Sequence, residues 1–320
     1  MGAVDEIVPC IQFLLTAARI VITILTNKYQ KREEKVMGTT ITVAIEKGGC
    51  GKTTTVLNFA DLAGNEARVL CIDTDPQGNL TYSLTDSRIT DSDHDGKALS
   101  DMYDNFEAIL CGEKSVTEYI TETKLENVDL IPASMHTPNI LSKAAELAEA
   151  VKAKKIDAPK ELEYNTAYLK YFIGLVKDKY DYIFIDTQPS RDSLLVTSSL
   201  LAADYILIPA KSGNYSADSA FRTYTYCKNL RDQDIAASKG IGLIQTMVQG
   251  SAAWSITREN YIRELGNVVF RAQIKYGKAV EASEMAGLPV VEYAKSQPTA
   301  KTYIEAWNEL KARLAESEDK

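Results

Sequence analysis

Ten residues, from Glu46 to Thr55, contain the residue types that bind a polyphosphate. They read Glu-Lys-Gly-Gly-Cys-Gly-Lys-Thr-Thr-Thr and lie between an apolar stretch typical of a β-strand, residues 41–45, and a helical pattern that begins at Val56. Glycines lack the Cβ atoms that would keep backbone N–H groups from wrapping a phosphate chain, and the positive end of the following helix faces the same anion. Strand, glycine-rich loop and helix in this order predict a phosphate-binding loop.

The end of this stretch supplies a cation and a hydroxyl. The ammonium of Lys52 is placed for the β- and γ-phosphates, and the hydroxyl of Thr53 suits Mg²⁺, which prefers oxygen ligands and usually binds through few protein groups. A glycine-rich turn that happens to end in Lys-Thr is the alternative, and the flanking strand and helix argue against it. The residues expected to contact the nucleotide are Gly48, Gly49, Cys50, Gly51, Lys52, Thr53 and Thr54.

Two acidic stretches follow apolar runs that read as buried strands. Asp186 ends the run 182–185, and the segment 73–79, Asp-Thr-Asp-Pro-Gln-Gly-Asn, follows the run 68–72. Ligands of open α/β sheets bind at the carboxyl ends of strands, and phosphoryl transfer to water needs a cradle, a metal and a group that positions the water. We expect Asp186 to hold Mg²⁺ through water. Aspartate as a simple turn former is the alternative for either acid alone.

Strand and helix patterns alternate along the rest of the chain. Such alternation predicts an α/β fold of the P-loop NTPase type, with a doubly wound, mostly parallel sheet of about seven or eight strands and helices on both faces. Strands are expected at 40–45, 68–72, 128–132, 182–186, 205–208 and 241–246. Helices are expected after the phosphate loop to residue 62 and at 99–110, 140–155, from Pro159 to Lys179, 192–203, 216–230 and 255–265, and a packed terminal helix carries Tyr303, Ile304, Trp307, Leu310 and Leu314.

Composition limits the partners and the chemistry. The formal net charge is −8, so contact with nucleic acid would need a local basic patch. The five cysteines are odd in number and form no C-x-x-C pair, which indicates reduced thiols and supports neither a zinc nor an iron–sulfur site. With 45% hydrophobic residues in 320, the chain can bury a sizeable core.

The N-terminal 36 residues read as a separate apolar extension, followed by one domain over 37–320. Residues 7–26 could span a bilayer by length, but Arg19 near their centre would cost about 2.5 to 3.5 kcal/mol on insertion scales. A helix with one polar stripe, suited to a membrane surface or a partner, is one alternative. The other is a mis-assigned start, because residues 31–35 can be encoded almost wholly by purines, like a ribosome-binding sequence, and Met37 follows closely. We expect Met37 to be the functional start.

The run Lys-Gly-Gly-x-Gly-Lys-Thr-Thr resembles the deviant Walker A motif of the ParA/MinD family of dimeric ATPases, and the resemblance extends over nearly all of residues 39–316. It implies ATP with Mg²⁺ as cofactors, a homodimer formed on ATP binding, and Lys47 reaching the partner's phosphates. It also implies that Asp75 orients the attacking water, so that Lys47, Lys52 and Asp75 are the expected catalytic residues.

The chain departs from the family pattern in four places. Glu46 stands where the general phosphate-loop pattern has glycine, and Cys50 where the family mostly has valine. Residues 188–190, Gln-Pro-Ser, replace a pair of prolines, and residues 275–277, Lys-Tyr-Gly, replace the Pro-Arg-Asn stretch associated with adenine. These replacements affect the expected switch behind Mg²⁺ and the recognition of the base.

Local features favour the ParA/Soj type, which partitions plasmids or chromosomes, within this family. The chain lacks paired cysteines of an iron–sulfur carrier, and it ends in an acidic Ala-Glu-Ser-Glu-Asp-Lys, unlike the basic membrane helix of septum-positioning relatives. The resemblance therefore implies a cytoplasmic, nucleoid-associated ATPase that binds DNA without sequence preference and is stimulated by a ParB-like partner, with membrane contact disfavoured. A membrane-associated MinD-like regulator is the alternative.

One segment, 258–278, is locally basic and is the candidate DNA surface. Its basic side chains outnumber Glu259 and Glu264, and phosphate contacts alone can support nonspecific binding. An ordinary solvated helix face is the alternative. The predicted DNA contacts are Arg258, Arg263, Arg271, Lys275 and Lys278.

Overall fold

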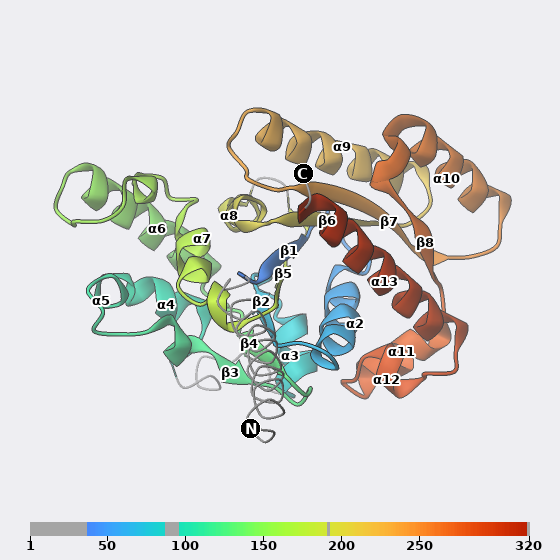
Figure 1. Ribbon diagram of the computed structural model, residues 1–320, viewed down its shortest axis with the longest axis horizontal. Coiled ribbons are helices and arrows are strands. Elements are labelled where there is room, and N and C mark those ends of the chain that lie inside the picture. The colour runs from blue at the N-terminus through green and yellow to red at the C-terminus, as the bar shows by residue number, and fades with distance from the viewer. Residues whose placement is uncertain (1–36, 87–95, 191–192, 319–320) are drawn as a thin grey trace, which may run out of the picture. The chain divides into compact units, whose positions relative to one another are not determined.

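The computed structural model describes residues 37–86, 96–190 and 193–318 (Figure 1). Its described strands form one eight-stranded sheet in the order β3-β4-β2-β5-β1-β6-β7-β8, and only the β3–β4 pair at one edge is antiparallel. The predicted α/β class and strand number are confirmed. The strands are β1 Thr39–Val43, β2 Val69–Asp73, β3 Thr121–Glu122, β4 Val128–Ile131, β5 Tyr182–Asp186, β6 Tyr205–Ala210, β7 Gly240–Val248 and β8 Val269–Lys275.

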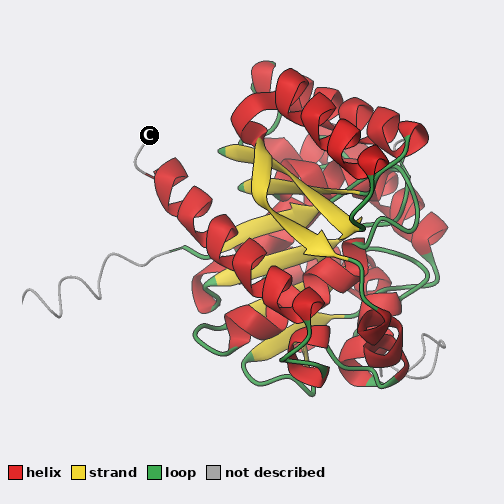
Figure 2. Ribbon diagram, turned by 90° about the vertical axis from the view of Figure 1, so that its right-hand side faces the viewer, coloured by secondary structure: helices red, strands yellow, loops and turns green. Residues whose placement is uncertain are grey.

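Helices cover both faces of this sheet (Figure 2). Alternating side chains of one strand enter different clusters, since Val69 and Cys71 of β2 pack with α2 and α13 whereas Leu70 and Ile72 pack with α4, α6 and α7. The helices are α2 Lys52–Gly64, α3 Asn79–Thr85, α4 Leu99–Asp104, α5 Phe106–Leu110, α6 Thr137–Lys152, α7 Tyr168–Gly174, α8 Leu194–Ala202, α9 Asn214–Asp232, α10 Ala252–Leu265, α11 Lys278–Met285, α12 Val290–Tyr293 and α13 Pro298–Glu318.

The terminal helix α13 packs as expected through most of its apolar stripe. Tyr303, Trp307, Leu310 and Leu314 are buried, and Trp307 lies against Phe59 of α2 with ring centroids 5.7 Å apart. Ile304 is 39% exposed, so its assignment to the stripe is wrong. None of the helices in the described ranges has both the length and the apolar character needed to cross a bilayer.

Two expectations about elements are corrected. The helix expected from Pro159 to Lys179 is broken into a 3-10 turn at 160–163, α7 and a second turn at 177–179. The first break is stabilised by the Tyr168 hydroxyl, which donates to the carbonyl of Leu162 over 2.9 Å. Strand β8 was not anticipated, because its polar residues and the register shifts in its pairing with β7 obscure the two-residue period.

The predicted extension, residues 1–36, lies outside the described residues, as does most of the polar segment 85–96. Within the described chain, β1 is the strand that leads into the phosphate loop, and it lies at the centre of the sheet between β5 and β6.

Candidate nucleotide site

Three adjacent parallel strands bring the predicted site residues to one edge of the sheet. Strand β5 pairs with β1 and with β2, and Asp186 aligns with Val43 on one side and Asp73 on the other. The phosphate loop follows β1 and Asp75 follows β2, so loop and carboxylates emerge together, as the carboxyl-edge rule predicts.

The phosphate loop owes its shape to two glycines with left-handed backbone. Gly49 has φ 67° and Gly51 has φ 81°, and Gly51 immediately precedes α2. The hydroxyl of Thr246 at the end of β7 donates to the carbonyl of Cys50 over 2.9 Å and so supports the loop from below. The loop forms the wall of a cavity of about 620 Å³, and the predicted residues that line it are Gly48, Gly49, Gly51, Lys52, Thr53, Thr54 and Asp75.

Asp186 is fully buried and is not among the residues that line this cavity, but it touches the loop directly. The Thr53 hydroxyl donates to Oδ2 of Asp186 over 2.7 Å, whereas Oδ1 makes no hydrogen bond to any described residue. Burial, reinforced by nearby Asp73, raises the pKa of Asp186 well above its ordinary value. Burial likewise lowers the pKa of Lys52, opposed by the charges of Asp186 and Asp75. The three carboxyl groups of Asp73, Asp75 and Asp186 surround the single ammonium of Lys52. Perturbed pKa values gathered beside a cavity in this way are typical of a functional site.

The two acids after β2 differ in their surroundings. Asp75 lines the cavity at 7% exposure and accepts a hydrogen bond from the amide of Gln77 over 3.0 Å. Asp73 is buried and accepts from both the amide and the hydroxyl of Thr81 over 2.9 and 2.8 Å. Burial raises the pKa of Asp73 to about 6 despite these bonds. Asp73 therefore supports the turn, and Asp75 is the acid that faces the cavity.

Lys47 and Cys50 are not among the residues that line this cavity. The ammonium of Lys47 lies 6.0 Å from the centroid of the exposed Tyr215 ring on α9, and the preceding Glu46 forms an ion pair with Arg222 of the same helix over 3.0 Å. Cys50 is fully buried in the cluster beneath α9 and α10. Its thiol is therefore a small core group and does not face the cavity.

Sequence comparison identifies the family. The AAA domain model matches residues 38–238. A ParA family protein from Chlamydia pneumoniae is 32% identical over 276 residues, which are 85% of this chain and 96% of that protein. The chain belongs to the ParA family. The chromosome-partitioning ATPase Soj of Treponema pallidum is 27% identical to this ParA-family chain over 87% of it and 98% of the relative.

Solved structures share the fold of this ParA-family chain at low identity. An ATP complex of a Cyanothece McdA variant has a TM-score of 0.68 at 21% identity and covers 85% of this chain and 96% of its own. The septum site-determining protein MinD from Pyrococcus horikoshii, complexed with Mg-ADP, has a TM-score of 0.61 at 20% identity and covers 88% and 99%. These likenesses show that the chain shares its fold with these two proteins.

The five residues predicted to bind DNA lie on three elements of the fold, α10, β8 and α11. Arg263 is exposed on α10 and pairs with Glu264 over 3.0 Å. The exposed Arg271 and Lys275 belong to β8 itself, which at about 3.3 Å per residue is roughly 20 Å long. Lys278 begins α11 beyond the strand and is also exposed. The four exposed basic residues are therefore divided among α10, β8 and α11, and we refer to them together as the basic strip.

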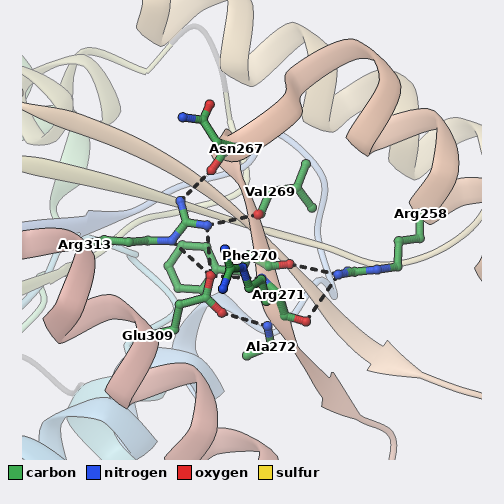
Figure 3. A network of polar contacts seen from close by, with 8 residues as sticks. All are labelled: Arg258, Asn267, Val269, Phe270, Arg271, Ala272, Glu309 and Arg313. Atoms are coloured by element: carbon green, nitrogen blue, oxygen red, sulfur yellow. Dashed lines mark hydrogen bonds and ion pairs between the residues drawn. The ribbon is translucent and has the colours of Figure 1, made fainter. Parts of the chain in front are cut away.

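Arg258 has a different environment from the other four. Its guanidinium donates to the carbonyls of Phe270 and Arg271 over 3.3 and 3.2 Å (Figure 3). It also donates to the side chain of Gln245 over 3.0 Å. Strand β8 is also held from α13, where Glu309 accepts from the amides of Arg271 and Ala272 over 2.9 and 2.7 Å. Arg258 thus stabilises β8 through its hydrogen bonds, and its guanidinium is less exposed to solvent than the other four basic side chains.

Three residues near the phosphate loop were not anticipated from the sequence. The ammonium of Lys211, which directly follows β6, lies 3.8 Å from the point that a Cβ on Gly49 would occupy. Met247, with a left-handed φ of 57°, and Glu284 of α11 line the cavity. The rule that sites form at strand ends could have found Lys211 and Met247. No local signal marks Glu284.

Proposed function

We propose that this ParA-family chain is a Mg²⁺-dependent ATPase that partitions DNA: it dimerises around ATP, binds DNA without sequence preference and hydrolyses ATP when a ParB-like partner stimulates it. The observation that carries the ATPase is that Thr53, which lines a glycine-lined cavity, donates its hydroxyl to buried Asp186. Chromosome-partitioning Soj from Treponema pallidum and a solved plasmid partition protein from Borrelia burgdorferi support the choice of DNA as cargo.

The donor set fits Mg²⁺ and a nucleotide phosphate. Oδ1 of Asp186 lacks a partner among the described residues, the Thr53 hydroxyl is adjacent, and both are the hard oxygen donors that Mg²⁺ prefers. When bound, the ion neutralises charge that develops on the phosphate oxygens. Lys52 and the loop amides hold the phosphates, and Asp75 faces the cavity where it can orient the attacking water.

Lys47 is proposed to serve the partner subunit's nucleotide. It does not line its own cavity, and a preorganised cation aimed at developing charge is often the largest catalytic contribution. Lys47→Ala should then prevent both ATP-dependent dimerisation and turnover, and Asp75→Ala should leave a dimer locked with ATP. Light scattering with an ATPase assay measures both; normal turnover by monomeric Lys47→Ala protein would refute the assignment.

DNA binding is proposed for the strip of Arg263, Arg271, Lys275 and Lys278, all exposed. Each phosphate contact adds roughly 0.9 to the slope of the salt dependence, and dimerisation doubles the strip, so ATP acts as the switch through effective concentration. Changing Arg263 and Lys278 together to Glu should abolish DNA retention and leave basal ATP turnover intact. Unchanged retention at low and moderate salt would place DNA elsewhere.

The experiment that tests the cargo is ATP-dependent sedimentation of the full chain with duplex DNA or with anionic lipid vesicles. Partition predicts co-sedimentation with DNA in ATP but not in ADP, and a cytoplasmic, nucleoid-associated protein. The fold likeness to MinD from Pyrococcus horikoshii is the reason to include vesicles. Retention on vesicles alone would favour a membrane-associated regulator instead.

A further inference from the structure

Glu284 places a second carboxylate, besides that of Asp75, in the lining of the nucleotide cavity, and the proposed hydrolysis does not use it. Its Oε1 accepts a hydrogen bond from the hydroxyl of Thr54 over 3.0 Å, and both residues line the cavity. Thr54 belongs to the first turn of α2, whereas Glu284 lies on α11, 230 residues further along the chain. This bond therefore joins the phosphate loop's helix to a helix near the C-terminus.

The carboxylate of Glu284 lies beside Thr54 in the first turn of α2, directly after the phosphate loop. The first turn of a helix attracts negative charge through its free N–H groups and its dipole. A phosphate chain in the loop would bring further negative charge to the same turn, and the single Thr54 hydroxyl proton can serve only one acceptor. Glu284 and the nucleotide thus compete for one location.

We propose that Glu284 is an anionic latch: it holds α11 against the phosphate-loop helix in the ligand-free protein and is displaced when nucleotide phosphates bind. This inference rests on the proposed ATPase function and adds a control on its affinity.

The neighbouring helix is anchored independently of the latch. The amide of Val291 in α12 donates to the side chain of Asn58 in α2 over 3.1 Å, and Gly287, with φ 63°, separates the two helices. Release of Glu284 would therefore loosen the end of α11, whose Ala279 and Val280 still pack on the core, while α12 stays in place.

The test compares Glu284→Gln with the matched variant Glu281→Gln. Glutamine keeps an acceptor for Thr54 and removes the charge, and Glu281 is an exposed acid of the same helix that does not line the cavity. By calorimetry at low salt, Glu284→Gln should bind ATP and ADP about fivefold more tightly than wild type, because a like charge near the phosphates has been removed. The gain should shrink at high salt, and adenosine affinity should not change. Glu281→Gln should match wild type.

Hydrogen exchange supplies a second measurement. A non-hydrolysable ATP analogue should speed exchange of α11 amides in wild type but not of α12 amides, and Glu284→Ala should show fast α11 exchange without nucleotide. Equal or weaker ATP binding by Glu284→Gln, or the same gain in Glu281→Gln, would overturn the latch alone. Absence of ATP binding in wild type would instead overturn the proposed ATPase.

Discussion

Two charged regions of the described chain treat their buried charges in opposite ways. Beneath the phosphate loop, one oxygen of Asp186 has no partner among the described residues, and burial raises the pKa of its carboxyl group. Beside β8, Glu309 is partly buried, with 18% of its side chain exposed, and burial alone would raise its pKa too. There, hydrogen bonds from two backbone amides and from Arg313 hold that pKa below its ordinary value (Figure 3).

The difference separates a binding site from a structural device. Buried polar atoms are almost always hydrogen-bonded. A buried carboxyl oxygen that has no partner beside a cavity is therefore available to a ligand, whereas a carboxylate bonded to main-chain amides has a structural role. β8 is an edge strand of the sheet, and Glu309 accepts hydrogen bonds from two of its main-chain amides. Unpaired main-chain groups of an edge strand could otherwise pair with another chain. Charge and burial alone do not distinguish the two regions; the hydrogen-bond partners do.

The largest expected effect is at Asp186. Asp186→Asn should lower ATP turnover by about 100-fold or more, the usual cost of losing a preorganised electrostatic group. It should also raise the melting temperature of the ligand-free protein. Because the folded-state pKa lies above the unfolded value, the acid's favourable contribution exists at low pH and is lost as pH rises, so the stability gain should grow with pH. ATPase assays and thermal unfolding across pH check this, with exposed Asp104→Asn as control; lower stability at neutral pH would contradict the comparison.

Glu309→Ala should have the reverse pattern. It leaves the amides of Arg271 and Ala272 and the Arg313 guanidinium without their acceptor, which should cost about 2 to 4 kcal/mol of unfolding free energy. Turnover per folded molecule should stay within about twofold of wild type, since the site is elsewhere. Urea unfolding measures the loss, and Glu305→Ala on the exposed face of α13 is the matched control. A stable but inactive Glu309→Ala protein would refute the structural assignment.

Lys211→Met tests whether a residue outside the phosphate loop, residues 46–55, also contributes to phosphate binding. Its ammonium lies against Gly49, so its loss should weaken ATP binding by about tenfold, as for one charge-assisted contact. The exposed Lys170 of α7 provides a control for net charge. If Lys211→Met and Lys170→Met bind ATP equally to wild type, Lys211 belongs to the scaffold.

The smallest effect is expected at Asp61, which tests whether a raised carboxyl pKa by itself marks a functional residue. Burial and the neighbouring charge of Glu292 raise the pKa of Asp61 to about 6, yet Asp61 does not line the cavity. Its favourable contribution to stability is complete below pH 4 and is lost as pH rises through about 6. Asp61→Asn should therefore be more stable than wild type by up to about 1 kcal/mol above pH 6, after allowing for solvent screening, and equal to it near pH 4. Turnover should not change, and a fall in turnover would show that a raised carboxyl pKa is enough to mark function.

The sequence by itself determined the phosphate loop, the order of the parallel strands along the chain and the convergence of Thr53, Asp75 and Asp186. These follow from local spacing and from the rule that parallel strands end at one edge, so they need no knowledge of packing. Only the tertiary structure decided that Arg258 donates hydrogen bonds to β8, that Lys211 lies against Gly49 and that Glu284 accepts a hydrogen bond from the Thr54 hydroxyl. Each of these contacts depends on how helices and loops pack on the sheet, and residue spacing does not encode that geometry.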